Sequence, residues 1–114
     1  MAIKIINDPI SKNELQKIAE NQFGDLVKAV VDIEKETMAI GGDLHADEEK
    51  TLLEEGSKQE NLWGVNLHIN QPVDEWIEFD SMINVRPSQN NKSRGVESLE
   101  IQRKIRDIVS RLIF

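Results

Sequence analysis

The sequence contains no cysteine, and this absence excludes several kinds of site. It rules out a disulfide framework, a thiolate nucleophile and a Cys-based zinc or iron–sulfur centre. Long hydrophobic runs are also missing, so no membrane span is predicted, and residues 1–6 lack the pattern of a cleaved secretory signal. Together these absences favour a cytoplasmic protein with no membrane partner.

Low-complexity tracts and internal repeats are absent as well, which argues against long disordered segments and repeat architectures. A chain of 114 residues has the usual size of one domain, so we expect a single domain over residues 1–114. Its hydrophobic content of 39% and charged content of 31% are typical of a folded, well-charged protein.

Positive charge is scarce in most of the chain. Residues 1–80 carry 18 acidic and 7 basic side chains, whereas residues 81–114 carry 3 acidic and 7 basic ones. The second part holds all five arginines, which are Arg86, Arg94, Arg103, Arg106 and Arg111. The net charge of −7 disfavours nonspecific attraction to DNA, so nucleic-acid binding is not expected. The uneven distribution favours either attraction between two parts of the fold or arginines gathered around an anionic ligand.

The first third of the chain predicts a strand, a helix and a hairpin. Residues 3–6 form a short strand or extended lead-in. Ser11 and Glu14 make a capping box for a helix that Gly24 ends. Its apolar face is Leu15, Ile18, Ala19 and Phe23. The β-branched residues of 26–34 predict a strand, with 37–40 as its hairpin partner.

A second helix is expected within residues 43–55, with Leu52 and Leu53 facing inward and Gly56 as its stop. The last helix should begin near Glu97. Its buried stripe is Ile101, Ile105, Ile108, Val109 and Leu112.

Residues 63–86 carry the clearest sheet signal, because apolar and polar residues alternate on both sides of a short connection. The apolar set is Trp63, Val65, Leu67, Ile69, Ile77, Phe79, Ile83 and Val85. An antiparallel hairpin with this connection sets His68 opposite Glu78 and Asn66 opposite Asp80. Because the apolar residues of both strands must face the core, a shift of the register by one residue is excluded. A shift by two residues is not excluded.

The order of elements is therefore roughly β-α-β-β-α-β-β-α. This order predicts an α+β fold with a mostly antiparallel or mixed sheet and about three helices, which we expect on one side of the sheet.

The first candidate site is a metal-binding group around Asp43, His45 and Asp47. Alternating carboxylate, imidazole and carboxylate ligands could converge on a divalent cation after two glycines. The spacing matches no established metal motif. The alternative is a glycine turn followed by a helix start whose acidic residues favour the helix dipole.

The second candidate site is the polar face of the predicted hairpin, with His68, Glu78 and Asp80. Two carboxylates on one strand face can crowd each other, so that the raised pKa of one supplies a general acid beside a general base. The alternative is a solvated face with ordinary cross-strand pairs. Trp76 and Met82 share this face and favour either a pocket or a surface covered by another element or subunit.

The third candidate site is the polar loop of residues 86–95, which contains Arg86 and Arg94. Both arginines could bind an anionic group, while Asn84, Asn90 and Asn91 could add hydrogen bonds. This is not a Walker A loop, because it lacks the Gly-Lys-Ser/Thr core. The alternative is a hydrophilic loop whose arginines pair with local acidic residues.

Three blocks of sequence resemble a known family. They are His-Ala-Asp-Glu-Glu at residues 45–49, Gly-Ser-Lys-Gln-Glu-Asn-Leu-Trp-Gly at residues 56–64 and Asp-Ser-Met-Ile-Asn-Val-Arg-Pro-Ser-Gln at residues 80–89. Together they resemble a small family of uncharacterised microbial proteins, a domain of unknown function, over nearly the whole chain. The resemblance implies a stand-alone domain and adds no catalytic residue.

Two functional hypotheses follow. In the first, a small cytoplasmic domain or small enzyme binds an anionic or metal-associated ligand, in a pocket where residues 66–68, 78–86 and 94 meet; no cofactor is specified. In the second, the protein is a noncatalytic interaction module or a homodimeric regulatory protein. Trp63 or Trp76, together with the arginine-rich end, would then contact an acidic patch on another chain.

Overall fold

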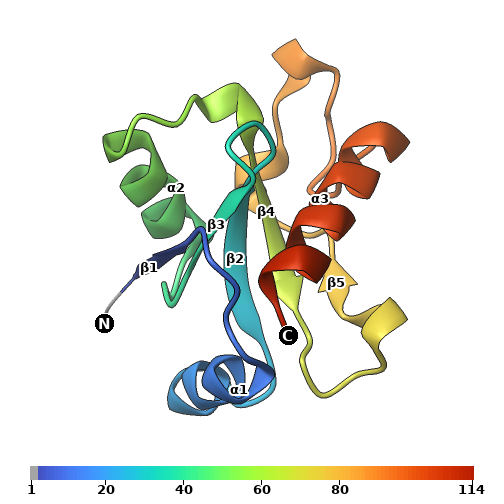
Figure 1. The fold of residues 1–114 in the computed structure, drawn as a ribbon. Helices are drawn as coiled ribbons and strands as arrows, with labels where there is room; N and C mark the ends of the chain where they lie inside the picture. Colours follow the sequence, from blue (N-terminus) through green and yellow to red (C-terminus); the bar gives the residue numbers. More distant parts are fainter. Residues whose placement is uncertain (1–2) are drawn as a thin grey trace.

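A five-stranded antiparallel sheet runs through the middle of the fold, which a computed structural model describes for residues 3–114 (Figure 1). Its spatial order is β1-β3-β2-β4-β5. The strands are β1 (Lys4–Ile6), β2 (Val27–Asp32), β3 (Thr37–Ile40), β4 (Leu62–Leu67) and β5 (Ile77–Glu78). The helices are α1 (Lys12–Asn21), α2 (His45–Glu54) and α3 (Leu99–Leu112). The predicted α+β class and the predicted order of strands and helices are confirmed.

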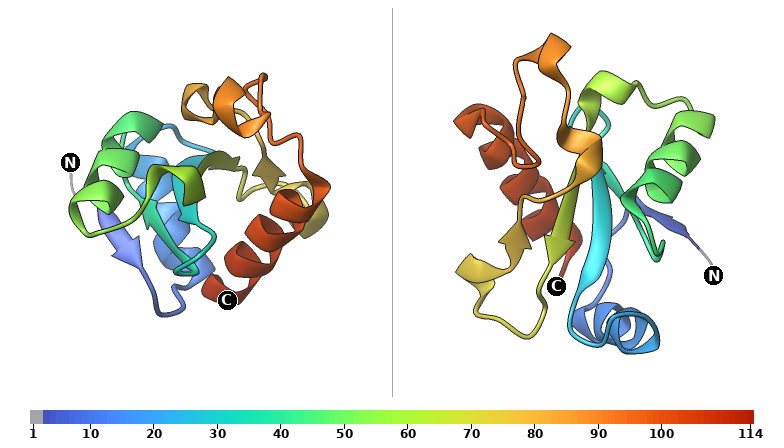
Figure 2. Two further views of the ribbon diagram at one scale, coloured as in Figure 1. Left: turned by 90° about the horizontal axis from the view of Figure 1, so that it is seen from above. Right: turned by 180° about the vertical axis from the view of Figure 1, so that it is seen from behind.

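Helices cover both faces of the sheet, which corrects the expectation that they lie on one side. Figure 2 shows α2 and α3 on opposite sides of the strands. On one face, apolar residues of α1 and α3 pack against alternate positions of β2, among them Ala29 and Val31. On the other face, Leu52 of α2 packs with Val30 and Ala39. Strand β2 is buried on both faces, so its near-continuous apolar run reflects two layers of cover.

The predicted helix starts are confirmed by their caps. The Ser11 hydroxyl accepts a hydrogen bond from the Glu14 amide at 3.2 Å, and the Ser98 hydroxyl does the same for Ile101 at 3.2 Å. Two residues expected to face the core do not. Phe23 is 41% exposed, because α1 ends at Asn21 and Phe23 lies in the turn that follows. Leu53 is 40% exposed, because the buried face of α2 includes its neighbour Leu52 instead.

The hairpin between β4 and β5 is antiparallel, but its register differs from the prediction by two residues. Asn66 pairs with Glu78, where Asp80 was expected, and the His68 amide donates to the Trp76 carbonyl at 2.8 Å. His68 and Trp76 therefore face each other at the turn, so the connection between the strands begins two residues earlier in the chain than predicted. The sequence could not exclude this slip, since it keeps the same residues on each face.

The strand predicted to continue to residue 86 ends after Glu78. The Ser81 hydroxyl accepts a hydrogen bond from the Ile83 amide at 3.3 Å and starts a short 3-10 turn, η3 (Met82–Asn84). A second short turn follows as η4 (Pro87–Gln89). Local capping by serine thus outweighs the alternation of apolar residues, and Val85 is 37% exposed.

Candidate functional site

A pocket of about 280 Å³ lies on the α2 side of the sheet, where the start of α2 meets the segment that follows β5. It is lined by Lys28, Leu44, His45, Ala46, Asn66, Asp80, Ser81, Met82, Ile83 and Arg94. The pocket therefore combines parts of all three candidate sites. It includes Asn66, Asp80 and Arg94 from the pocket predicted at residues 66–68, 78–86 and 94, together with His45 from the predicted metal site.

The floor of the pocket comes from two neighbouring strands. Lys28 of β2 pairs in register with Asn66 of β4, so both side chains emerge on the α2 face. Gly64 lies on the same face. A Cβ atom there would come within 2.6 Å of the Ser81 Cβ and Oγ atoms and 3.2 Å of the His45 ring. The missing side chain is what allows α2 and the segment after β5 to approach the sheet this closely.

One wall of the pocket is the beginning of α2. Leu44 occupies the N-cap position and supplies no side-chain hydrogen bond to the helix. The first backbone N–H groups of an α-helix have no partner within the helix, and the helix dipole adds partial positive charge there. Because the first two helical residues, His45 and Ala46, both line the pocket, this wall favours a negatively charged ligand.

His45 is a neutral imidazole in this wall. Its side chain is buried, and its Nε2 lies 2.8 Å from the Val65 carbonyl oxygen. A carbonyl oxygen only accepts, so Nε2 carries the hydrogen and Nδ1 is the accepting nitrogen of the ring. Burial lowers the pKa of His45, which keeps the ring uncharged at neutral pH.

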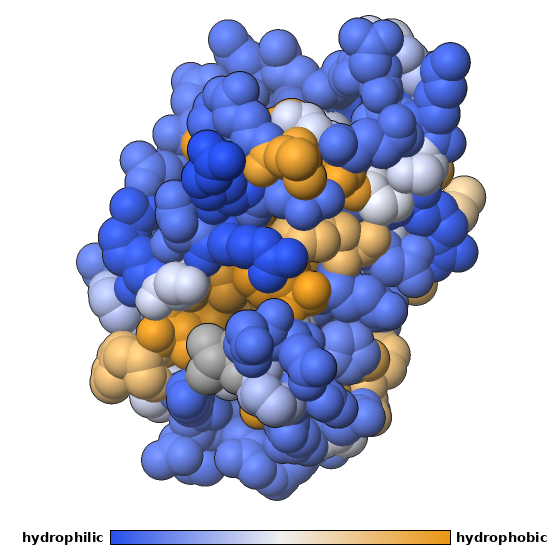
Figure 3. All heavy atoms as spheres, turned by 90° about the vertical axis from the view of Figure 1, so that its right-hand side faces the viewer, coloured by the Kyte–Doolittle hydropathy of each residue, from blue (hydrophilic) through white to orange (hydrophobic). Residues whose placement is uncertain are grey.

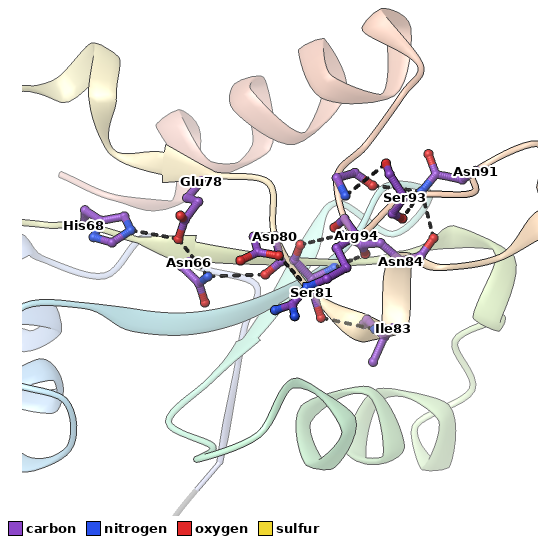
Figure 4. Close-up of polar contacts among 12 residues, drawn as sticks. Asn66, His68, Glu78, Asp80, Ser81, Ile83, Asn84, Asn91, Ser93 and Arg94 are labelled. Carbon is purple, nitrogen blue, oxygen red and sulfur yellow. Dashed lines mark hydrogen bonds and ion pairs between the residues drawn. The ribbon is translucent and has the colours of Figure 1, made fainter.

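Arg94 and Asp80 form the opposite wall. The Arg94 Nε donates to Asp80 Oδ1 at 2.7 Å, as Figure 4 shows beside Ser81. The backbone carbonyl of Arg94 accepts hydrogen bonds from the Ser81 amide and from the Asn84 side chain, at 2.9 and 3.0 Å. These bonds fix the backbone of Arg94. Its side chain is 56% exposed and lines the pocket, and the bond to Asp80 uses Nε and not the terminal nitrogens.

The rim of the pocket is apolar. Leu44 is 59% exposed and Met82 is 66% exposed, and both line the opening. The position of Met82 among polar residues had predicted either a pocket or a covered surface, and the structure places it beside a pocket.

The predicted group of His68, Glu78 and Asp80 is divided between two contacts. His68 Nε2 lies 3.0 Å from Glu78 Oε1, whereas Asp80 pairs with Arg94. Hydrogen bonds from His68 and, second, from Asn66 lower the pKa of Glu78. This direction is opposite to the raised pKa expected of a general acid. Of the three residues, only Asp80 lines the pocket.

Arg86 lies away from the pocket and is committed to the fold. Its guanidinium lies over the Trp63 ring at 4.2 Å from the ring centre, and it donates to the carbonyl oxygens of Gln59 and Leu62. The side chain is buried, and this burial lowers its pKa. Arg86 therefore binds both β4 and the loop that precedes β4, and it stabilises the contact of its own segment with them.

The asparagines of the third candidate site are also engaged by the backbone. Asn84 exchanges two hydrogen bonds with the backbone of Gly64, at 2.8 and 3.0 Å. The Asn91 amide donates to the carbonyls of Asn84 and Gly95, at 2.7 and 2.8 Å. Asn90 is an exposed residue with a φ of 61° in the left-handed region. Asn84 and Asn91 thus hold the loop that presents Arg94.

The predicted metal ligands are not brought together. Asp43 accepts a hydrogen bond from the Gln22 side chain at 3.0 Å, His45 binds the Val65 carbonyl, and Asp47 lies in the first turn of α2. Within residues 3–114, no group of three or more His, Asp or Glu side chains is arranged to hold a metal ion.

Sequence reasoning missed Lys28 as a pocket residue, whereas Asn66 lay within the predicted pocket of residues 66–68, 78–86 and 94. Lys28 was taken as part of a strand, and only the pairing of β2 with β4 brings it beside Asn66. One signal for the close approach was Gly64, a glycine inside a strand where another segment lies against the sheet.

The chain belongs to a family of proteins of unknown function, DUF5674, whose model matches residues 4–112. This finding confirms the family resemblance drawn from the sequence. Neither the curated proteins nor the solved structures include a match to the chain. In the part of the chain that the structure describes, no helix has the length and apolar character needed to cross a membrane.

Proposed function

We propose that the protein binds a small anionic ligand in the pocket between the start of α2 and Arg94. One observation carries the proposal: Lys28, Arg94 and an α-helix N-terminus without a side-chain cap all meet in this pocket. Each of these groups favours negative charge, and they come from three distant parts of the chain.

The charges around the pocket support an anion over a cation. Asp80 is the acidic residue among the lining groups, and its carboxylate is already paired with Arg94. Lys28 adds a second positive charge from the floor, and the Ser81 hydroxyl can donate a further hydrogen bond. The pocket is thus locally basic in a chain whose net charge is −7.

Titration calorimetry with phosphate and small carboxylates tests the proposal, with two substitutions that remove charge from the pocket. Losing a charge-assisted hydrogen bond of 1.5–3 kcal/mol corresponds to roughly a ten- to hundredfold loss of affinity, which we expect for Arg94→Gln and Lys28→Gln. Arg103→Gln is the matched control, because Arg103 is an exposed residue of α3 outside the pocket lining. It should bind as the unchanged protein does.

Two results would overturn this proposal. The first is that none of the anions binds the unchanged protein. The second is that Arg94→Gln and Lys28→Gln bind as tightly as Arg103→Gln, which would place the anion elsewhere on the surface.

An interaction module or homodimer is the second candidate function, and the exposed Leu44 and Met82 favour it. The indole rings that were predicted to contact another chain are buried within the fold. Trp63 is 1% exposed and Trp76 is 6% exposed, and the Trp76 Nε1 donates to the Gln71 carbonyl at 2.8 Å. Light scattering across a range of protein concentrations distinguishes the two functions. A concentration-dependent dimer that Met82→Ser abolishes would support association.

A further inference from the structure

The Asn66 side chain carries a buried acceptor that nothing in residues 3–114 satisfies. Asn66 is 7% exposed, and its Oδ1 has no hydrogen-bond partner in this part of the chain. Most buried polar side-chain atoms in proteins are paired, and leaving one unpaired costs about 1–3 kcal/mol. This acceptor therefore requires an explanation.

The contacts of the amide nitrogen fix the direction of this acceptor. Asn66 Nδ2 donates to Glu78 Oε1 at 3.0 Å and lies 3.3 Å from the Asp80 carbonyl oxygen. Both partner atoms accept hydrogen bonds and do not donate them here. If the Asn66 amide were rotated by about 180°, its oxygen would face these two oxygens and could bond to neither. Figure 4 shows the Asn66 oxygen on the side of the amide away from Glu78 and Asp80.

The residues around Asn66 define what could satisfy it. Asn66 lines the pocket described above, beside Lys28 on the neighbouring strand. A metal ion is a poor match for this acceptor, because the ammonium group of Lys28 and the guanidinium of Arg94 would repel it. A ligand atom that donates a hydrogen bond is compatible with both cations if the same molecule also carries negative charge.

We infer that the ligand is a small anion with a hydrogen-bond donor next to its anionic group, as in α-hydroxy and α-amino carboxylates, and that Asn66 selects for this donor. This inference rests on the proposed function. The carboxylate would lie toward the start of α2 and Arg94, and the hydroxyl or ammonium group toward Asn66. A site that pairs a buried acceptor with a ligand donor discriminates strongly against analogues without the donor, because the acceptor is then left unpaired.

Three acids of the same carbon skeleton test the inference in titration calorimetry: propionate, lactate and alanine. Propionate lacks the donor, lactate carries a hydroxyl and alanine carries an ammonium group. We expect lactate, alanine or both to bind at least about tenfold more tightly than propionate, and the better of the two identifies the donor. Asn66→Ala should remove this preference and leave the affinity for propionate within about threefold of its original value.

Glu78→Gln is the matched control, since it changes a partner of the Asn66 nitrogen and keeps the acceptor oxygen in place. It should retain the preference. The Asn66→Ala variant fails to fold if it shows no cooperative thermal transition. In that case, the relative affinities of the unchanged protein for the three acids still test the inference.

The possible failures are distinguishable. If propionate binds as tightly as lactate and alanine, the inference is overturned while the proposed anion site stands. If none of these acids binds and phosphate does not bind either, the proposed function fails and the inference fails with it.

Discussion

Glu48 is an acidic residue of α2 that is fully buried, with an exposed fraction of 0%. Its Oε2 accepts a hydrogen bond from the Gly42 amide at 3.0 Å, and a Cβ atom on Gly42 would lie 2.7 Å from the Glu48 Cγ. Burial raises the pKa of Glu48 to about 9, although the bond from Gly42 opposes the shift. The folded protein therefore holds Glu48 as a neutral acid at neutral pH.

The raised pKa of Glu48 predicts a stability that falls as pH rises. Between its ordinary pKa of 4.5 and about 9, the folded protein keeps a proton that the unfolded chain releases, so the free energy of unfolding decreases across this window. Glu48→Gln is neutral in both states and lacks this dependence. From about pH 5 to about pH 8, we expect its stability relative to the unchanged protein to rise by about 4 kcal/mol.

Urea unfolding of both proteins at the two pH values measures this difference. All other titrating groups are common to the pair, so their contributions cancel. Equal pH dependence in the two proteins would show that Glu48 ionises in the fold.

At the scale of elements, the segment between β5 and α3 has little regular structure and depends on side-chain amides. Asn91 is 3% exposed, donates to the carbonyls of Asn84 and Gly95, and accepts from the Glu97 amide at 2.8 Å. These side-chain hydrogen bonds take the place of the backbone hydrogen bonds that a β-strand would make with a neighbouring strand. The neighbouring Asn90 is exposed and sits in the left-handed region.

Asn91→Ala should destabilise the protein by about 2–3 kcal/mol, because it leaves several buried backbone groups without partners. Asn90→Gly is the matched control and should change stability by no more than about 0.5 kcal/mol, since glycine adopts the left-handed region freely. Denaturant unfolding measures both effects. Hydrogen exchange at the Glu97 amide should accelerate in Asn91→Ala alone; unchanged exchange there would contradict the role assigned to Asn91.

The elements that sequence predicted correctly are those with local signals. The capping box at Ser11 and an apolar stripe predicted α1, an apolar stripe predicted α3, and dense β-branched residues predicted β2 with β3 as its hairpin partner. The prediction was wrong at residues 79–86, where apolar alternation suggested a strand. There the chain follows the Ser81 cap and the Asn84 side chain, whose partner Gly64 is 20 residues away.

The candidate site was predictable in part. Asn66, Asp80 and Arg94 fell within the pocket predicted from residues 66–68, 78–86 and 94, whereas His45 was named only in a separate metal-binding motif. Lys28 required the pairing of β2 with β4, which depends on long-range register. The role of Arg86 was also beyond local reasoning, because its partners are the Trp63 ring and two carbonyls of another segment.

On the scale of the whole molecule, the acidic and basic parts of the chain meet through few ion pairs within residues 3–114. Arg94 binds Asp80 at 2.7 Å, and Arg111 binds Glu36. All four side chains are about half exposed, so each pair contributes little to stability. The uneven charge of the sequence is therefore not what holds the fold together; the buried apolar clusters on the two faces of the sheet are.

Stability should consequently depend weakly on salt. Raising sodium chloride from about 0.02 M to about 0.5 M screens exposed pairs, and we expect the free energy of unfolding to change by less than about 1 kcal/mol. Thermal unfolding at fixed pH in a series of salt concentrations measures this. A loss several times larger would show that the two oppositely charged parts stabilise each other electrostatically.

The side of the molecule formed by α3 and β5 combines apolar and hydrophilic surface (Figure 3). A pocket of about 330 Å³ opens there, beside Trp76 and the last turn of α3. Lys12 lies 5.3 Å from the centre of the Trp76 ring, so the ammonium group sits over the indole face. The start of α1 is thereby tied to this side of the fold.

The two ends of the described chain are also joined by backbone hydrogen bonds. The amides of Ile10 and Lys12 donate to the carbonyls of Leu112 and Phe114, each at 2.8 Å, and the Phe114 amide donates back to Ile10 at 3.0 Å. On a translating ribosome, the segment that leads into α1 emerges early but lacks these partners until residue 114 has left the exit tunnel. Residues 10–12 therefore gain these hydrogen bonds only after residues 112–114 have been synthesised.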